Sequence, residues 1–176
     1  MPRVPGRRWL ATLRGLRPAL TTGRPPTPGE YAWAVREVFG PTLPPRTRLR
    51  LTPALGPGGR AFTLPWPGRR VLVGLGPDRY ADPVGVDPGL FVHELTHAWQ
   101  VAHARSRLGW LFAGVAVQLR HRRGEDVYDP GAGGRPWGAY TIEQQATIVA
   151  RWTVGDAAAR ARWAAYVDQV RRTPVS

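Results

Sequence analysis

The chain has 176 residues and a formal net charge of +13; 43% of its residues are apolar, and it contains no cysteine. This length predicts one domain, and the apolar fraction argues against wholesale disorder. The lack of cysteine excludes disulfides, thiol nucleophiles and iron–sulfur clusters, so any bound metal must be held by histidine and carboxylate side chains.

All 25 basic residues are arginine. Lysine and asparagine are absent, while arginine, alanine, glycine and proline are abundant, so part of the charge is attributed to a GC-rich coding sequence. A basic surface can still attract nucleic acid or an anionic surface, and this stays a rival hypothesis. Nucleic acid is not the expected partner, because no helix-turn-helix, RNP or zinc-finger pattern is present.

Residues 1–26 contain six arginines, no acid and several prolines and glycines, which predicts a basic, flexible N-terminal arm. The ordered domain is expected over residues 27–172. The apolar stretch in the arm is broken by Arg14, Arg17 and Pro18 and does not fit a secretory signal. We therefore expect a cytoplasmic protein, with export by a dedicated system as the alternative.

The first half of the domain is predicted to contain one helix and a small sheet. Thr27-Pro28-Gly29-Glu30 is typical of a helix start, and the helix should end near Phe39, before Gly40-Pro41. Three short β-type runs separated by Pro- and Gly-rich turns predict a small antiparallel sheet; they lie around Thr47–Leu51, Ala61–Leu64 and Val71–Leu75.

The second half is predicted to be helical. Asp87-Pro88 starts a helix with apolar residues at helical spacing. The next helix, Leu108 to Arg120, contains the longest apolar run, which is too short to span a bilayer at roughly 20 residues per helix and is expected in the core. A glycine-rich loop over residues 124–138 and two further helices follow, near Thr141–Val154 and Asp156–Arg171. The whole pattern predicts an α+β fold.

The motif H-E-x-x-H lies within the helix that starts at Asp87, as His93-Glu94-Leu95-Thr96-His97. Two histidines four residues apart can reach one metal ion from the same helix face. Glu94 lies beside that ion, where it can take a proton from the activated water and pass it to a leaving group. The alternative is two partly buried histidines on an ordinary amphipathic helix.

A catalytic zinc site needs a third protein ligand, and Glu143 is the leading candidate. It falls on the apolar face of the helix near Thr141–Val154, where a carboxylate is costly unless it is paired or binds a metal. The alternative is a glutamate at the rim of this face or paired with an arginine. His103 has metzincin spacing, but Gln100 replaces the required glycine, so a continuing helix would point His103 away from His97.

Three blocks of the sequence together resemble a known family: His93–Gln100 (HELTHAWQ), Thr27–Gly40 (TPGEYAWAVREVFG) and Tyr140–Val149 (YTIEQQATIV). They are similar to the small bacterial zincin-like family often labelled Vgr-related, akin to metallopeptidase-like domains found near contractile injection systems. The resemblance implies a gluzincin arrangement, with Zn²⁺ bound by His93, His97 and Glu143 and with Glu94 as the catalytic glutamate. It also suggests association with a secretion or injection system.

A tetrahedral intermediate also needs a hydrogen-bond donor opposite the metal. Tyr140 is the first candidate, and the alternatives are Tyr128, His121 and Arg135. The sequence thus predicts a zinc-dependent metallopeptidase that acts on a peptide or protein. A zincin-fold accessory or binding module without turnover is the alternative, because about 150 ordered residues leave little room for a substrate-binding subdomain.

Overall fold

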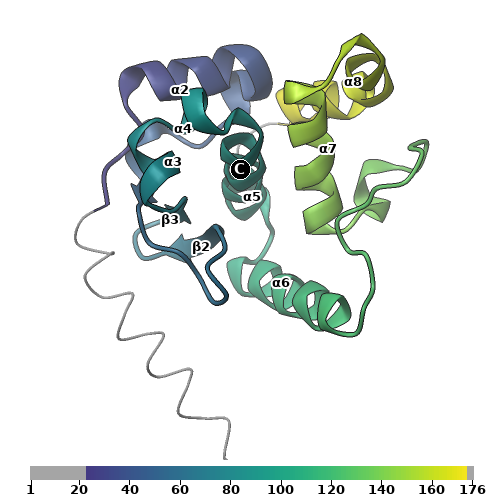
Figure 1. Ribbon diagram of the computed structural model, residues 1–176, viewed down its shortest axis with the longest axis horizontal. Coiled ribbons are helices and arrows are strands. Elements are labelled where there is room, and N and C mark those ends of the chain that lie inside the picture. Colours follow the sequence, from purple (N-terminus) through teal and green to yellow (C-terminus); the bar gives the residue numbers. More distant parts are fainter. Residues whose placement is uncertain (1–22, 174–176) are drawn as a thin grey trace, which may run out of the picture.

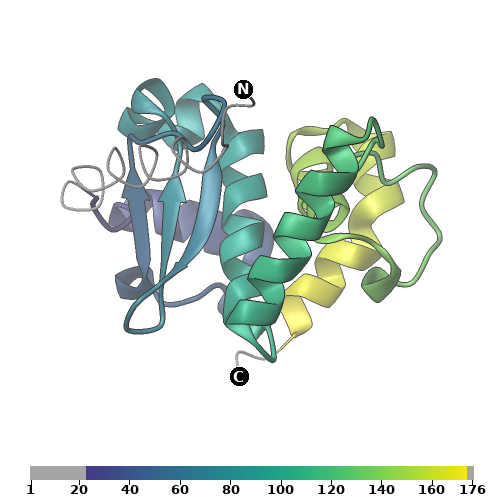
Figure 2. The ribbon, with the colours of Figure 1, turned by 90° about the horizontal axis from the view of Figure 1, so that it is seen from below.

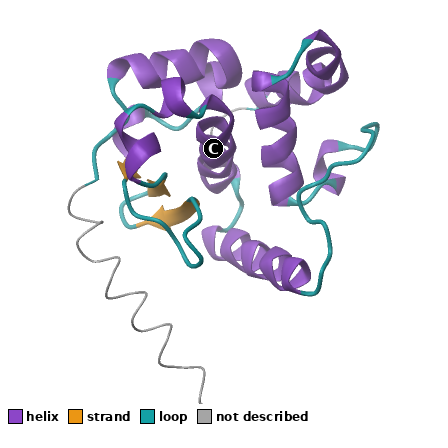
Figure 3. Ribbon diagram, in the orientation of Figure 1, coloured by secondary structure: helices purple, strands orange, loops and turns teal. Residues whose placement is uncertain are grey.

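Residues 23–173 are described by a computed structural model, apart from the side chain of Arg122. They form the predicted α+β fold, in which the long helix α5 (Pro88–His103) packs against a three-stranded sheet on one side and against helix α7 (Ile142–Val154) on the other. Figure 1 shows α5 between these two parts, and Figure 3 shows all the strands on one side of α5. Helix α5 is therefore the element that connects the two halves of the domain.

The predicted first helix is confirmed, with an unexpected change of helix type. Helix α2 (Pro28–Ala34) starts with a capping box, in which Thr27 Oγ1 accepts from Glu30 N and the Glu30 carboxylate accepts from Thr27 N. It continues as the π-helical segment η1 (Val35–Phe39) and the 3₁₀ turn η2 (Gly40–Thr42). The neighbouring side chains Val38 and Phe39 are both fully buried in the π segment.

Residues 1–22 of the predicted arm lie outside the described residues. Of the remaining four, Arg24 forms a backbone bridge with Leu51, with N–O distances of 2.9 and 2.7 Å. Its guanidinium also binds both carboxylate oxygens of Glu30, at 2.7 and 2.8 Å. The chain is therefore attached to the domain just before the helix start at Thr27.

The sheet is mixed, which corrects the prediction of a purely antiparallel one. The strand order is β1-β3-β2, and the strands are β1 (Leu49–Thr52), β2 (Phe62–Trp66) and β3 (Arg70–Gly74). The short β2–β3 turn makes these two strands antiparallel, whereas β1 pairs with β3 in parallel. Residues 53–61 join β1 to β2 and are long enough to leave room for another strand between them. The later strand β3 occupies this central position.

The core lies between the sheet and α5. Leu49, Leu51, Val71 and Val73 from the sheet belong to the same buried cluster as Leu95 of α5. In Figure 2 the sheet and α5 lie side by side, with α8 (Ala157–Arg172) beyond them. This packing fixes one face of α5 and leaves the opposite face for α7.

The long helices α6 (Arg107–Arg122) and α8 lie close to the predicted boundaries, whereas two short helices between β3 and α5 were not predicted. Side chains cap several helices: Asp87 caps α5, Ser106 caps α6 and Asp156 caps α8. The remaining elements are η3 (Arg46–Arg48), α3 (Pro77–Ala81), α4 (Pro83–Val86), α6 (Arg107–Arg122), η4 (Trp137–Ala139) and α8 (Ala157–Arg172). Across the part of the chain that is described, no helix combines the length and apolar character that crossing a bilayer requires.

Helix α6 is the exception to the predicted packing. The sequence predicts a core helix over Leu108–Arg120, but of its large apolar side chains only Val117 is buried. Leu108, Phe112, Val115 and Leu119 are exposed to solvent. The prediction failed because a run of apolar residues does not reveal whether both faces of a helix find a packing partner.

Candidate metal centre

Two histidines from α5 and one glutamate from α7 meet between these helices. The candidate ligand atoms of His93, His97 and Glu143 all lie within 4.8 Å of one another. Glu143 Oε2 is 3.2 Å from His93 Nε2 and 3.3 Å from His97 Nε2. The structure therefore brings together the three residues that the sequence proposed as ligands.

Local helix geometry explains how these side chains converge. His93 and His97 are one turn apart on α5, and their ring centroids are 4.8 Å apart with the planes nearly perpendicular. Glu143 lies in the first turn of α7, whose capping box joins Thr141 and Gln144. The positive end of a helix dipole favours a carboxylate at this position.

The three side chains are only slightly exposed, at 16% for His93, 6% for His97 and 12% for Glu143. Burial alone would raise the pKa of the Glu143 carboxyl group, but hydrogen bonds from the two histidines outweigh it, so its pKa lies below the usual range. Glu143 is therefore a charged carboxylate, the form that binds a cation.

His97 carries a proton in the metal-free protein. Burial lowers the pKa of its imidazole. The hydrogen bond to Glu143 and the charges of Glu143 and Glu94 outweigh this effect and raise the pKa to about 9. At neutral pH this proton lies where a metal ion would bind. A cation must therefore displace it, as is usual for histidine ligands.

Gln100 orients the ring of His97. Its amide nitrogen donates to Ile142 O at 3.0 Å and to Gln145 Oε1 at 2.9 Å, so its oxygen faces His97 and accepts from Nδ1 at 2.8 Å. Nδ1 therefore carries a proton whether or not a metal ion is bound, and Nε2 is directed at Glu143. Such a second hydrogen bond is the usual way in which a metal-binding histidine is held.

Sequence reasoning treated Gln100 only as a departure from the metzincin pattern. Its contact with His97 could have been predicted from its position three residues later, which places both side chains on the same helix face.

Glu94 is buried beside the triad, with 4% of its surface exposed. Its Oε2 accepts a hydrogen bond of 2.7 Å from Thr63 Oγ1 on β2. Its charge contributes to the raised pKa of His97. The sequence did not predict this contact, because Thr63 lies in a strand 31 residues before Glu94.

Helix α6 contributes one wall of the site. The Trp110 ring lies edge-on to His97, with centroids 5.9 Å apart, and its Nε1 is 3.4 Å from Gln100 Oε1. An aromatic wall reduces the access of water to the buried imidazole. Trp110 was not predicted to lie at the site.

Tyr140, the first sequence candidate for an oxyanion donor, makes its contacts elsewhere. Its hydroxyl is 3.2 Å from the hydroxyl of Tyr166 and accepts from Arg135 N at 3.4 Å. Its ring is buried in a cluster with Ile148 and Trp163. These contacts are those of a packing residue, and the catalytic role of Tyr140 stays a prediction.

The other sequence candidates also lie outside the triad. His103 stacks on Trp99, and its Nδ1 donates to Trp99 O at 2.7 Å, as expected if the helix continues through Gln100. The rings of Tyr128 and His121 pack against each other, 5.4 Å apart. None of the three belongs to the group of side chains that could hold a metal ion in the described part of the chain.

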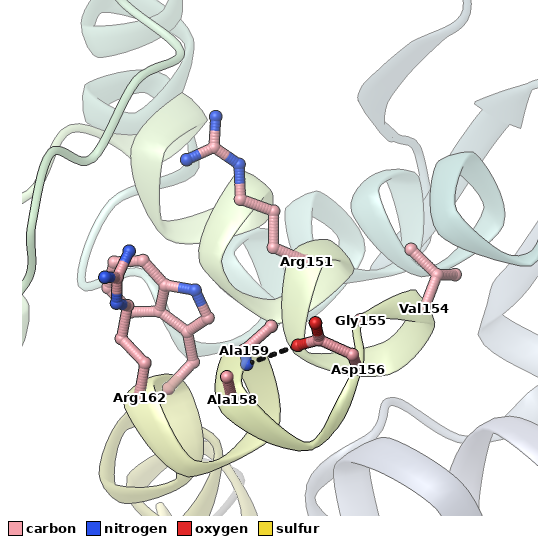
Figure 4. Close-up of a pocket in the computed structure, with 8 residues that line it drawn as sticks. Arg151, Val154, Gly155, Asp156, Ala158, Ala159 and Arg162 are labelled. Carbon is pink, nitrogen blue, oxygen red and sulfur yellow. Dashed lines mark hydrogen bonds between the residues drawn. The ribbon is translucent and has the colours of Figure 1, made fainter.

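A separate surface pocket lies where α7 meets α8 (Figure 4). Arg151, Asp156 and Arg162 are among its lining residues, and Asp156 accepts from Ala159 N at 2.9 Å as the cap of α8. The pocket includes no residue of the triad, and the carboxylate in it already has a structural role.

No protein-family model, curated protein or solved structure matches this chain. The support for a metal site therefore comes from the triad itself. Two imidazole nitrogens and one carboxylate oxygen that lie within 4.8 Å of one another form a donor set that zinc uses when it keeps an open position. The residues present fit a divalent transition-metal ion.

Proposed function

We propose that this protein is a zinc-dependent metallopeptidase, in which His93, His97 and Glu143 hold the ion and Glu94 is the general base. The observation that carries the proposal is the convergence of the three ligand atoms within 4.8 Å, with a second carboxylate, the buried Glu94, beside them. A candidate metal site with a carboxylate next to it supports the proposal, because this chemistry requires at least an ion and an acid–base group.

A zinc ion in this site would polarise the carbonyl of the scissile peptide bond and lower the pKa of a water molecule. Glu94 would accept a proton from that water and donate it to the amine that leaves. The hydrogen bond from Thr63 holds one oxygen of the Glu94 carboxylate, so the other is available for this transfer. Gln100 keeps Nε2 of His97 directed at the ion.

Elemental analysis of the purified protein tests the ligand assignment. We expect about one zinc ion per chain in the wild type and its loss in His97→Ala and Glu143→Ala. His103→Phe is the matched control, because it keeps the ring stacked on Trp99 and should retain zinc. Stoichiometric zinc in Glu143→Ala, or its loss in His103→Phe, would refute the assignment.

Peptide hydrolysis by Glu94→Gln tests the catalytic role. Loss of a general base should lower kcat by about 10²–10⁴-fold while zinc stays bound. Glu125→Gln is the control, because Glu125 lies on the surface in an ion pair with Arg120. Equal rates for Glu94→Gln and the wild type would mean that Glu94 is not the base.

Tyr140 remains the proposed donor to the oxyanion. To act there, its hydroxyl must leave Tyr166 and turn towards the triad when substrate binds. Tyr140→Phe should then lower kcat by about 10²–10³-fold. An unchanged kcat would leave Tyr140 with its packing role alone.

The second candidate is a zincin-fold binding module that holds zinc without turnover. The small size of the domain supports it, since residues 23–173 leave little room for a separate substrate-binding subdomain. Bound zinc with no hydrolysis across broad peptide libraries would favour this function, whereas turnover that depends on Glu94 would remove it. Cytoplasmic location and association with an injection system stay predictions from the sequence.

A further inference from the structure

Helix α6 has two apolar faces, and only one of them is packed. The inner face includes Trp110, which contacts His97, and Val117, which is 6% exposed. The outer face consists of Leu108, Phe112, Val115 and Leu119, with exposed fractions of 67%, 72%, 57% and 48%. We call these four residues the outer face of α6.

The four residues of the outer face lie on one side of α6. They follow each other at intervals of four, three and four, which places them within about 60° around the helix axis. In Figure 1 α6 runs along the lower edge of the molecule, with one end near β2 and away from α8. Contiguous exposed apolar patches on a soluble protein usually mark a contact with a partner or a membrane.

Arginines lie at both ends of the outer face. Residues 105–123 contain five arginines and no acid. At the start of α6, Arg107 donates to Trp66 O at 3.2 Å and to Arg70 O, which brings the β2–β3 turn with its exposed arginines, Arg69 and Arg70, to this end. At the other end Arg123 is exposed, and Arg120 pairs with Glu125.

We propose that α6 docks on an anionic membrane surface, with the outer face in the lipid interface and the flanking arginines on the phosphates. A helix that combines an exposed apolar face with basic residues and no acid has the composition of an interfacial helix. Arginines next to a lipid surface that carries negative charge add to the attraction of the buried apolar area. An anionic membrane surface thus matches both the apolar outer face and the flanking arginines of α6.

Charge argues against the other occupants. Residues 1–22 contain five arginines and no acid, so docking this segment on α6 would bring two basic segments together. A second copy of the chain, packed α6 against α6, would do the same. Nucleic acid would satisfy the arginines but would leave the four apolar side chains in water.

Docking would also hold the candidate metal centre near the membrane, because the inner face of the same helix contacts His97. The inference does not depend on zinc or on peptidase activity. It can therefore be tested in the full chain without any assay of function.

The lack of cysteine makes a site-specific test possible. Val115→Cys carries a polarity-sensitive fluorophore on the outer face, and Val86→Cys on α4 is the matched control, since both valines are 57% exposed. With vesicles of phosphatidylcholine and about 30% phosphatidylglycerol, the label at position 115 should shift to the blue. The label at position 86 should not shift, and pure phosphatidylcholine vesicles should shift neither.

Vesicle sedimentation of the unlabelled double variant Phe112→Ser/Leu119→Ser gives an independent measurement. The variant keeps every arginine, so its partitioning into the same anionic vesicles should fall by about tenfold if the outer face inserts. Its thermal unfolding should match the wild type, because both side chains are already exposed.

Several results would overturn the proposal. If the double variant and the wild type partition equally, vesicle binding depends on the arginines alone. If the wild type does not bind anionic vesicles, the proposal is wrong. If the label at position 115 is shielded from water without vesicles, something else covers the outer face. Shielding that rises with protein concentration would indicate a second copy of the chain, and shielding independent of concentration would indicate residues 1–22. Binding to nucleic acid that the double variant loses would also contradict the proposal.

Discussion

Gln100 joins the two helices that supply the candidate metal ligands. One side chain accepts from His97 and donates to the backbone of Ile142 and to Gln145, so the imidazole of α5 is oriented by the start of α7. Replacing a hydrogen-bond partner of a metal-binding histidine usually weakens metal affinity without removing a ligand. This makes Gln100 a positioning residue that can be separated from the triad.

Gln100→Ala should therefore weaken zinc binding by about 10–100-fold. The dissociation constant can be measured by competition with a chelator of known affinity. Gln118→Ala is the control, because Gln118 is exposed on α6. An affinity equal to that of the wild type would show that packing alone orients His97.

The protonated His97 predicts that zinc binding depends on pH. Because the pKa of its imidazole is about 9 in the metal-free protein, zinc must displace a proton throughout the range below that value. Affinity should thus rise by about tenfold for each pH unit between 6 and 8.

Calorimetric titration in buffers with different ionisation enthalpies measures the protons released. At pH 8 we expect about one proton per zinc ion. A histidine with an ordinary pKa near 6.5 would be almost fully neutral at pH 8 and would release almost none. Affinity that does not change between pH 7 and 8 would contradict the protonated state of His97.

At the level of single elements, the start of α7 determines where Glu143 lies. The capping box pairs Thr141 Oγ1 with Gln144 N at 3.2 Å and Thr141 N with Gln144 Oε1 at 3.1 Å. These bonds fix the first turn of α7, where Glu143 is found. The cap therefore supports both the stability of the helix and the position of a candidate ligand.

Thr141→Ala should lower the free energy of unfolding by about 1 kcal/mol. Urea denaturation measures the change. Thr147→Ala, inside the same helix and away from its cap, should be neutral or slightly stabilising because alanine has the higher helix propensity. Equal effects of the two substitutions would mean that the cap contributes nothing specific.

The helices themselves were largely predicted from their sequence. Caps such as Thr27 and Asp87 and the spacing of apolar residues are local signals, and helix hydrogen bonds are local too. The π-helical segment Val35–Phe39 was not predicted, because the pattern of buried residues in a short segment does not distinguish the two helix types.

For the whole molecule, the candidate metal centre links the two halves of the domain. His93 and His97 belong to the helix that packs on the sheet, whereas Glu143 belongs to the C-terminal helices. An ion bound to all three would hold α5 and α7 together only in the folded state. Metal binding should therefore stabilise the entire fold.

Thermal unfolding with and without zinc tests this coupling. At a free zinc concentration of 100 times the dissociation constant, the gain should be about 2.7 kcal/mol, and a chelator should reverse it. Glu143→Ala should show little of this gain, since it lacks the ligand from α7. A zinc-induced rise in Tm as large in Glu143→Ala as in the wild type would mean that the ion binds elsewhere.

The sequence by itself determined the α+β class, the main helices, the H-E-x-x-H motif and the proposal of Glu143 as the third candidate ligand. These features depend on local spacing: His93 and His97 are one turn apart, and Glu143 interrupts an apolar helix face. Local periodicity is read directly from the chain because it follows from helix geometry.

Only the tertiary structure decided the order of the strands, the partners of Glu94 and His97, and the exposure of α6. Each of these depends on contacts between distant segments: β1 pairs with β3, Thr63 reaches Glu94, and Gln100 contacts α7. Leu108 and Phe112 resemble core residues in the sequence, but no described element covers them. A pattern within one helix states which faces are apolar, while packing across the whole molecule decides which of those faces is buried.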